Sequence, residues 1–513
     1  MFCLVYLGRV SSKLLSLALI LQSFLLCMVA VIVYRVSYGF DPFIHDAAVK
    51  EIMRLGQIIP LTPYYLGQYS IVIVLQNISS VAANVWAKLL VPGMSVLLIG
   101  PLILRWLNKH HGSEKDWGLA AVAALFLSVS LFIVTTPQSL AYIFLLIVIL
   151  WPSPKPTNSE KTVVWIAALA ALVTQPIAGI PACLIALYDT VKKIQTNQKI
   201  YKLFILSLIL VLPLAFYFSS RLDSSIAVSL SWPQLQWLLA FLPNNPHVNS
   251  WWINATYLFE SLRPLIVVLL IILGTKVSFS SHSSELKRRF FWPAIALLGS
   301  ALLASSLNFH FLIDYERSDY PQRLLTTSLI IALPLLLSAL RQIALYLEKS
   351  SRLVFINIAA IIIIMALANL YLSYPRFDHY YNSHSYASSQ ADLLSVRWIE
   401  KDAKNEPYIV LANQQVSAAA LREFGFAHYY NNFFYYPIPT GGVMYSYYLE
   451  MTKSPTKTVV ENAMKKAGVK NAYLVLNSYW WDYKTIAPQA EAIALKSQDI
   501  GNGQNTIYVF SIE

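Results

Sequence analysis

Charged residues are scarce in this sequence. They make up 12% of its 513 residues, whereas a soluble globular protein carries about a quarter. Apolar residues make up 57%, the mean hydropathy is +0.54, and the apolar residues come in long uninterrupted runs. This composition excludes a soluble enzyme, a disordered chain and a nucleic-acid-binding protein. It predicts a polytopic α-helical membrane protein.

Cysteine is scarce as well. The three cysteines are Cys3, Cys27 and Cys183, and two of them stand within apolar runs. None follows residue 183, so no disulfide framework can hold the C-terminal part of the chain together. No internal repeat or low-complexity segment stands out either.

The net charge of +12 is unevenly distributed along the chain. Residues 374–513 hold 12 basic and 12 acidic residues, whereas residues 1–373 hold 26 basic and 14 acidic residues. The whole excess therefore lies in the apolar part. A basic excess among membrane spans reports which loops face the cytoplasm, and it does not indicate a nucleic-acid partner.

A helix needs about 20 apolar residues to cross a bilayer. The first run, Leu14 to Tyr34, follows Arg9 and Lys13 and has no small-residue cleavage site after it. We expect an uncleaved signal anchor with a cytoplasmic N-terminus. Two later runs are short. Pro176 and Pro181 make it uncertain where the run that begins near Thr162 ends and the run that begins near Ile177 starts. The later runs begin near Trp86, Trp117, Gln138, Thr162, Ile177, Tyr201, Thr256, Phe290, Leu324 and Leu353.

The segment from Tyr64 to Ser80 is apolar enough to span, but counting it as a span would place four basic clusters outside the cell. We therefore expect a helix that lies at the outer surface or re-enters from it. About eleven spans remain, in the plasma membrane, with the C-terminal part outside. The inner segments then carry 18 basic and 6 acidic residues, and the outer side of the membrane part carries 8 of each.

The sequence predicts two domains, a transmembrane domain over residues 1–373 and an extracytoplasmic α/β domain over residues 374–513. The second begins after Tyr374-Pro375, where helix and strand patterns start to alternate. The helices are predicted at 386–401, 415–424 and 456–467, and the strands at 408–412, 472–476 and 507–511. Three outer segments of the membrane part are long enough to build a site, namely 35–83, 219–255 and 308–323.

The first outer segment contains a helix-start signal. Asp41 precedes Pro42, which predicts a helix with Asp41 as N-cap and Pro42 at the first helical position, ended by Gly56. His45 is one turn after Asp41 and Asp46 follows it, on the side away from the apolar face. Asp41 either only caps this helix, or it is a base or metal ligand at the membrane surface, where the head group of a lipid-linked substrate would lie.

The stretch Gly39-Phe-Asp-Pro-Phe-Ile-His45 after a first span resembles the first outer loop of the GT-C superfamily of membrane glycosyltransferases. Its nearest pattern is that of oligosaccharyltransferase catalytic subunits. The many spans followed by an outer α/β part, and the surface segment after Pro63, are also similar. The resemblance implies that Asp41 is the catalytic carboxylate, with His45 and Asp46 as neighbours, and that a polyprenyl phosphate is the leaving group.

The sequence departs from that family at two motifs. Where oligosaccharyltransferases have a second acidic motif, this chain has Thr135-Thr-Pro-Gln-Ser139, and Gln138 brings no charge. Asp41 would therefore be the residue to hold a divalent metal, and a metal site of two carboxylates is doubtful. The family's tail signature is also absent from its place. Trp480-Trp-Asp-Tyr483 occurs about seventy residues later, and we interpret it as a loop at a strand end.

The third outer segment supplies candidates for phosphate binding. Arg323 stands where the next span begins, and a guanidinium there suits a lipid phosphate, with Arg317 as the second candidate. An arginine at a span end that snorkels and pairs with Asp319 or Glu316 is an equally good interpretation. Asp314 and Glu316 are accessory carboxylates by their position.

Taken together, these features predict a glycosyltransferase of the cell envelope. It would move a sugar from a polyprenyl-phosphate-linked donor to an unidentified glycan, lipid or protein acceptor, outside the membrane, and its other partners would be membrane lipids. Three alternatives stay open: a ligase or polymerase of lipid-linked glycans, a non-catalytic scaffold with this fold, and a transporter or flippase. The near absence of charge within the spans argues against the last.

Overall fold

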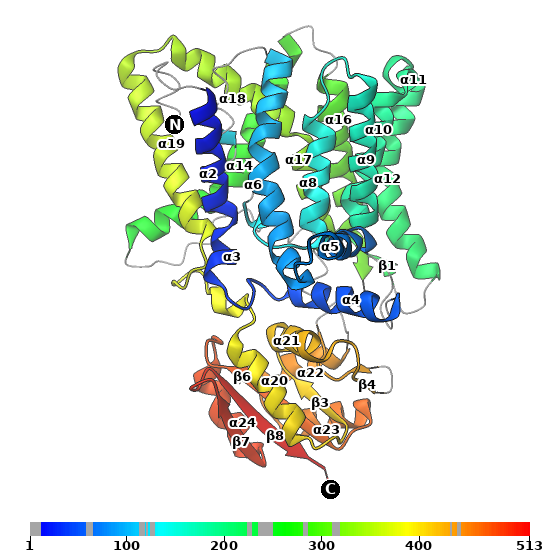
Figure 1. Cartoon of the computed structure of the whole chain (residues 1–513), viewed down its shortest axis with the longest axis vertical. Helices are drawn as coiled ribbons and strands as arrows, with labels where there is room; N and C mark the ends of the chain where they lie inside the picture. Colours follow the sequence, from blue (N-terminus) through cyan, green and yellow to red (C-terminus); the bar gives the residue numbers. More distant parts are fainter. Residues whose placement is uncertain are drawn as a thin grey trace.

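The computed structural model has a helical bundle at one end and a smaller α/β part at the other (Figure 1). The first outer segment lies between them. The structure describes residues 12–57, 65–111, 118, 122–123, 129–222, 228–233, 250–280, 286–309, 319–430, 433–438 and 443–512.

Helices, most of them apolar, build the bundle. Their order is α2 (Ser12–Cys27), α3 (Val29–Val33), α6 (Ala83–His111), α8 (Pro137–Leu150), α9 (Asn158–Thr174), α10 (Pro176–Thr190), α11 (Lys192–Thr196), α12 (Gln198–Leu222), α14 (Trp251–Ser280), α16 (Trp292–Ala304), α17 (Asp319–Ile331), α18 (Leu333–Glu348) and α19 (Arg352–Ser373). A π-helical turn, Lys287–Phe291, leads into α16, and strands β1 (Val228–Leu230) and β2 (Leu307–Phe309) pair antiparallel at the other end of it.

Four helices in the described part of the chain are long and apolar enough to cross a membrane, namely α6, α12, α14 and α19. The pair α17 and α18, bent by 47° at their junction, makes a fifth candidate span. This chain is therefore an integral membrane protein. Several other predicted spans are helices of 13 to 17 residues, such as α16 and α9, which is shorter than the roughly 20 residues a bilayer requires. The count of about eleven spans stays a prediction.

Helices α9 and α10 meet at the boundary that Pro176 and Pro181 left open. They form a tight antiparallel hairpin in which Gln175 alone joins them, ending α9 and capping α10 through its side chain. Gly179 lets the two backbones touch, because a Cβ atom there would lie 2.2 Å from the Cα of Leu172.

The core of the bundle surrounds α8, most of whose residues are buried. This helix is apolar on every side, as a helix enclosed by others must be. Short polar side chains stand only at its start, at Thr136, Gln138 and Ser139, and that end lies toward the α/β part. The basic segment α11 and the junction of α18 with α19 lie at the opposite end (Figure 1).

Two helices follow the first membrane helix on the side of the α/β part. Helix α4 (Asp41–Leu55) lies across the lower end of the bundle, and α5 (Leu66–Ser79) is seen there nearly end-on (Figure 1). As predicted, Gly56 ends α4 with a positive φ of 70°, and Ala47 and Ala48 are buried. The predicted N-cap is one residue off: Phe40 is the N-cap, and Asp41 is the first helical residue.

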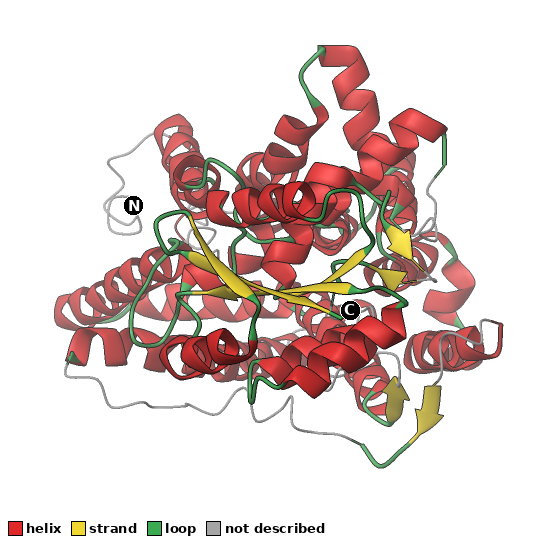
Figure 2. Ribbon diagram, turned by 90° about the horizontal axis from the view of Figure 1, so that it is seen from below, coloured by secondary structure: helices red, strands yellow, loops and turns green. Residues whose placement is uncertain are grey.

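The α/β part is built on a four-stranded sheet in the order β3-β6-β8-β7. Strand β3 runs parallel to β6, and β8 is antiparallel to both of its neighbours. Helices cover both faces (Figure 2). Along β6, Ala472, Leu474 and Leu476 pack on one side, and Tyr473 and Val475 pack on the other, as the two-residue period of a strand requires.

The strands are β3 (Tyr408–Leu411), β6 (Asn471–Asn477), β7 (Lys496–Ile500) and β8 (Asn505–Ser511), with a short pair β4 (Tyr429–Tyr430) and β5 (Phe433–Phe434). The helices are α20 (Gln390–Asp402), α21 (Gln414–Phe424), α22 (Val443–Met451), α23 (Lys457–Ala467) and α24 (Tyr483–Ile493). Residues 478–482, with most of the Trp480 motif, form the turn between β6 and α24.

Helix α20 begins four residues later than predicted. Ser389 caps it in a capping box with Asp392, so the helix cannot extend back to Tyr386. Residues 383–389 instead form a separate segment with a short 3₁₀ turn, Ser383–Ser385. This segment faces the first outer loop, because the N–H of Ser388 donates to the carbonyl of Gly39 at 3.3 Å.

Candidate functional site

Asp41 is the central residue of the site. It stands in the first turn of α4, where the free N–H groups of a helix favour a negative charge. Its half-buried carboxyl has no hydrogen bond or ion pair to any residue that the structure describes. The interpretation of Asp41 as only a helix cap is therefore not supported, because a capping carboxylate would accept a backbone N–H bond.

The charges around Asp41 come from a distant part of the chain. Burial raises the pKa of Asp41 to about 6, against the lowering effect of the nearby Arg323 and together with the raising effect of Asp319. A carboxyl with this pKa is mostly ionised at neutral pH and is a stronger base than an ordinary aspartate. Two of the predicted site residues, Asp41 and Arg323, thus lie near enough for their charges to interact.

Arg323 is in the second turn of α17, and Asp319 begins that helix. The Arg323 guanidinium lies 3.5 Å from the Asp319 carboxylate, which is the pairing that the snorkelling interpretation predicts. The pair is nevertheless loose, and both side chains stay partly exposed, at 31% and 45%. An exposed pair at this distance holds the guanidinium only weakly, so Arg323 remains available to an anionic ligand.

Gln138 also belongs to this neighbourhood. Its side-chain nitrogen donates to the Tyr142 hydroxyl at 2.7 Å, and that hydroxyl donates to the main-chain carbonyl of Arg323 at 3.3 Å. The end of α8 that lies toward the α/β part therefore supports the turn of α17 that carries Arg323. Gln138 contributes hydrogen bonds here and no charge.

Tyr386 comes to the site from the α/β part. Its ring lies 5.1 Å from that of Tyr38 and 6.0 Å from that of Phe40, and it contacts Gly39. Burial raises the pKa of Tyr386, and the charge of Asp41 raises it further, so the phenol stays protonated. Its hydroxyl has no hydrogen-bond partner among the described residues. A phenol and a carboxyl without hydrogen-bond partners among the described residues therefore lie near enough for the charge of Asp41 to act on Tyr386.

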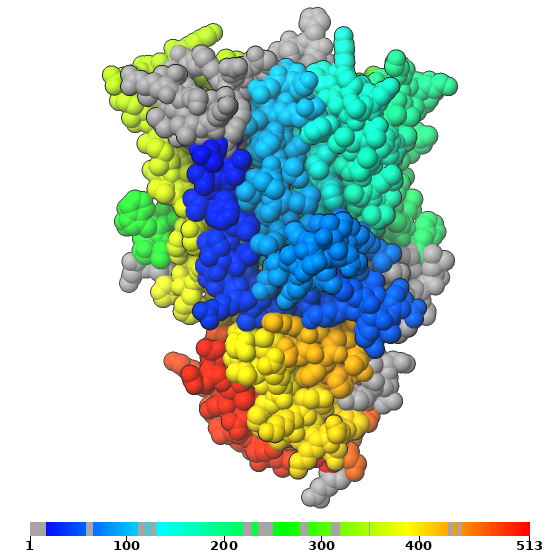
Figure 3. All heavy atoms as spheres, in the orientation of Figure 1, coloured from blue at the N-terminus to red at the C-terminus, as the bar shows by residue number. Residues whose placement is uncertain are grey.

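Two hydrogen bonds with Gln415 of α21 fix the segment that carries Tyr386. The side-chain amide of Gln415 donates to the carbonyl of Ser385, and Ser388 Oγ donates to the carbonyl of Gln415 at 2.8 Å. Figure 3 shows the first outer loop in direct contact with the α/β part along this junction. Sequence reasoning missed Tyr386. The only signal was the density of tyrosines just after the last apolar run.

His45 lies one turn along α4 from Asp41. Its Nδ1 is 3.0 Å from the hydroxyl of Tyr69 on α5. Burial lowers the pKa of His45 to about 4, so the imidazole is neutral at physiological pH. A neutral His45 leaves Asp41 as the one titrating group of this turn near neutral pH.

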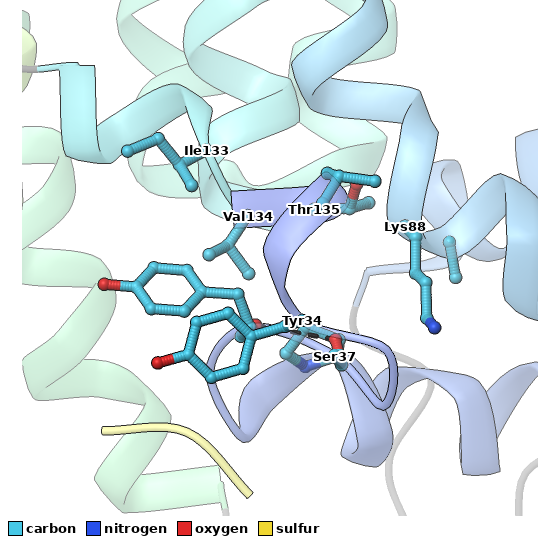
Figure 4. Close-up of a pocket in the computed structure, with 10 residues that line it drawn as sticks. Tyr34, Ser37, Lys88, Ile133, Val134 and Thr135 are labelled. Atoms are coloured by element: carbon cyan, nitrogen blue, oxygen red, sulfur yellow. Dashed lines mark hydrogen bonds between the residues drawn. The ribbon is translucent and has the colours of Figure 1, made fainter. Parts of the chain in front are cut away.

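Asp46 is placed differently from Asp41 and His45. It pairs with Lys50 of its own helix at 2.8 Å, and it lines a hollow of about 320 Å³ between α4, α6 and α21 together with Lys88 and Arg422. A second hollow of about 260 Å³ adjoins it, and Pro42 and Lys88 line both. In Figure 4, Lys88 borders this second hollow, with Tyr34, Ser37 and the residues Ile133 to Thr135 around it. The Lys88 ammonium donates to the carbonyl of Arg35 at 2.9 Å.

Three predicted residues, Asp314, Glu316 and Arg317, lie outside the described residues. Among the residues that are described, no group of three or more His, Cys, Asp or Glu side chains could hold a metal ion. Of the described residues, Asp41 and Asp319, with the Arg323 cation near them, do not by themselves make a divalent-metal site. The chemistry below is therefore assigned to the side chains themselves.

No protein-family model matches this chain, and no curated protein matches it. Among solved structures, the chain is similar to the archaeal oligosaccharyltransferase AglB from Archaeoglobus fulgidus, which was solved in complex with an inhibitory peptide and a dolichol-phosphate. The similarity covers 94% of this chain and 71% of AglB, with 13% sequence identity and a TM-score of 0.48. Similarity at this level assigns neither substrate nor activity.

Proposed function

We propose that the protein is a membrane glycosyltransferase that uses a polyprenyl-phosphate-linked sugar. The observation that carries the proposal is the electrostatic interaction of Asp41 with Arg323, because the fold brings a carboxyl with a raised pKa near a weakly paired guanidinium from a distant part of the sequence. The Asp-Pro motif of the first outer loop, which resembles that of GT-C enzymes, supports the same reaction.

In the proposed reaction the Asp41 carboxylate takes the proton of the acceptor nucleophile. The nucleophile attacks the anomeric carbon of the donor sugar from the side opposite to the phosphate. The carbon–oxygen bond to the phosphate breaks, and its electron pair leaves with the polyprenyl phosphate. Arg323 stabilises the charge that develops on the leaving phosphate. His45 lies one helical turn from the base, whereas Asp46 pairs with Lys50 and takes no part. The direct attack inverts the anomeric configuration.

The leaving group gives a test that requires no knowledge of the sugar. The thermal midpoint of the purified protein is measured with polyprenyl phosphate and with the matching polyprenol, which has the same tail and no phosphate. We expect only the phosphate to stabilise the protein, by about 2.7 kcal/mol at a hundred times its dissociation constant. Equal effects of both lipids, or none, would contradict the donor assignment and favour a scaffold or a transporter.

Tyr386 should affect the acceptor step. Tyr386→Phe keeps the ring against Tyr38 and removes only the free hydroxyl beside Asp41. We expect kcat/KM for the acceptor to fall about tenfold, the value of one hydrogen bond to a polar group, and polyprenyl phosphate to bind as before.

The control is Tyr473→Phe, which removes a hydroxyl that donates to Asp402, from a ring in the core of the α/β part. That variant should keep wild-type kinetics. If Tyr386→Phe also kept them, Tyr386 would be a packing residue and the site would not extend to the α/β part.

A further inference from the structure

Helices α14 and α19 form a pair at the surface of the bundle. Within the most apolar 18 residues of each helix, only 17% are buried in α14 and 11% in α19, whereas 61% are buried in α6. Leu265 on α14 and Leu367 on α19 are more than half exposed, at 53% and 62%. In a membrane these side chains contact lipid, so a partly exposed polar group at the edge of this pair is reached from the bilayer.

Arg263 is such a group. It lies within the candidate span of α14, next to Pro264, and its side chain is half-buried. Its Nη1 donates to Asn369 Oδ1 of α19 at 3.4 Å, a long hydrogen bond. No acidic oxygen of the described residues forms an ion pair with it. Glu260, one turn earlier on α14, acts on Arg263 only at longer range and lies 4.0 Å from Arg376. A guanidinium in a membrane helix without a close anion indicates a functional site.

Asn369 also has a hydrogen-bond donor without an acceptor among the described residues. It is 1% exposed, and its side-chain nitrogen is buried without a hydrogen-bond partner in the described part of the chain. An unpaired buried donor destabilises the fold, because it has lost its hydrogen bonds to water. Arg263 and Asn369 together therefore present several N–H donors and lack acceptors. An anion with several oxygens supplies what this pair lacks.

The position of the pair identifies the source of that anion. Asn369 stands one helical turn before α19 ends at Ser373, so it lies about 5–6 Å inside the end of the helix. Trp251 and Trp252, stacked and 65% and 62% exposed, begin α14 at the same end of the bundle. Exposed tryptophans mark the membrane–water boundary, which is the depth of lipid phosphates.

This pair is separate from the Asp41 site. Arg376, next to Glu260, stacks over the ring of Tyr381, and the Tyr381 hydroxyl is 3.3 Å from that of Tyr38. Tyr38 in turn contacts Tyr386, which borders Asp41. A layer of tyrosine rings therefore stands between the two sets of charged groups.

We propose that Arg263 and Asn369 bind the phosphate group of a membrane lipid whose tails lie along α14 and α19. The guanidinium and the amide donate to the phosphate oxygens, and Leu265 and Leu367 contact the acyl chains. The site holds a lipid that is not a substrate and ties α14 to α19 at the base of the α/β part. It does not depend on the proposed transferase activity.

The test is a titration of the delipidated full-length protein in detergent with phosphatidylglycerol, followed by its thermal midpoint. Diacylglycerol with the same tails, and inorganic phosphate, are the comparison ligands. We expect phosphatidylglycerol alone to stabilise the wild type. Stabilisation by diacylglycerol would reduce the effect to apolar contact, and stabilisation by inorganic phosphate would make this a free-anion site, so either result overturns the proposal.

Two variants examine the site itself. Arg263→Gln should weaken phosphatidylglycerol binding at least about tenfold, since a charge-assisted hydrogen bond contributes about 1.5–3 kcal/mol. Asn369→Asp places a carboxylate against the guanidinium in place of the phosphate. It should raise the lipid-free midpoint and remove the response to phosphatidylglycerol, and it tests the proposal even if Arg263→Gln does not fold.

Two control variants distinguish this site from nonspecific electrostatic attraction of anionic lipid and from the proposed donor site. Arg352→Gln removes an exposed arginine from the other end of α19, and Arg323→Ala alters the proposed donor site. Both should keep the response of the wild type to phosphatidylglycerol. An equal loss in Arg352→Gln would indicate unspecific attraction, and a loss in Arg323→Ala would place the lipid in the donor site; each contradicts the proposal.

Discussion

Replacing Asp41 by Asn should abolish sugar transfer while the protein stays folded and still binds polyprenyl phosphate. General-base catalysis by a positioned side chain contributes about 10²–10⁴ in rate, so we expect a loss of that size in kcat. Asn keeps the shape of the side chain and cannot accept the proton. The measurement is the rate of polyprenyl phosphate release from a donor that the wild type turns over.

The pH dependence should reveal the same group. Burial raises the pKa of Asp41 to about 6, so the wild-type rate should rise as pH increases through about 6 and level off above it. His45, whose pKa is lowered to about 4, does not contribute to this rise.

The free energy of unfolding should fall over the pH range in which the rate rises. The folded-state pKa of this carboxyl exceeds its unfolded value of 3.8, so its ionised form is disfavoured in the folded protein. The cost is absent below the unfolded pKa, grows as pH rises between the two values, and is complete above about 6. Asp41→Asn should therefore be more stable than the wild type at neutral pH, by at most about 3 kcal/mol, and no more stable near pH 4.

The matched control is Glu51→Gln, which neutralises another acid of the same helix, one that pairs with Arg54 at the surface. It should leave rate and pH profile unchanged. If Asp41→Asn retained its activity, the Asp41 base would be refuted. Turnover without any dependence on Asp41 would point to a different site, and no turnover by any form would favour the scaffold alternative.

Arg323→Ala should weaken polyprenyl phosphate binding by about 10- to 100-fold. The wild-type guanidinium can donate two charge-assisted hydrogen bonds to a phosphate, each contributing about 1.5–3 kcal/mol. Arg323→Lys should restore part of the affinity, because it keeps the charge and loses the planar fork. The measurement is a binding isotherm of the lipid in detergent.

Arg54→Ala is the control for this second prediction, since Arg54 is an exposed arginine of the outer surface that pairs with Glu51 at 2.8 Å. It should bind the lipid like the wild type. If Arg323→Ala changed only the thermal midpoint, Arg323 would be a structural partner of Asp319, in keeping with the snorkelling interpretation, and the phosphate would have to bind elsewhere.

The sequence by itself determined the features that depend on neighbouring residues. Apolar runs form helices because they cannot leave backbone groups unpaired in lipid. Gly56 ends α4 because a glycine adopts a positive φ without strain. The strands β3, β6 and β8 stand within one or two residues of the predicted runs. These are consequences of local periodicity and of the conformational preference of single residues.

Only the tertiary structure decided how the site is composed. Whether Asp41 caps its helix or stays free depends on Phe40 taking the cap position, and the start of α20 at Gln390 depends on Ser389. The neighbours of Asp41 are decided by helix packing: α17 brings Arg323, and the α/β part brings Tyr386. Contacts between such distant residues leave no period in the sequence, because they arise only when apolar surfaces bury one another across the whole fold.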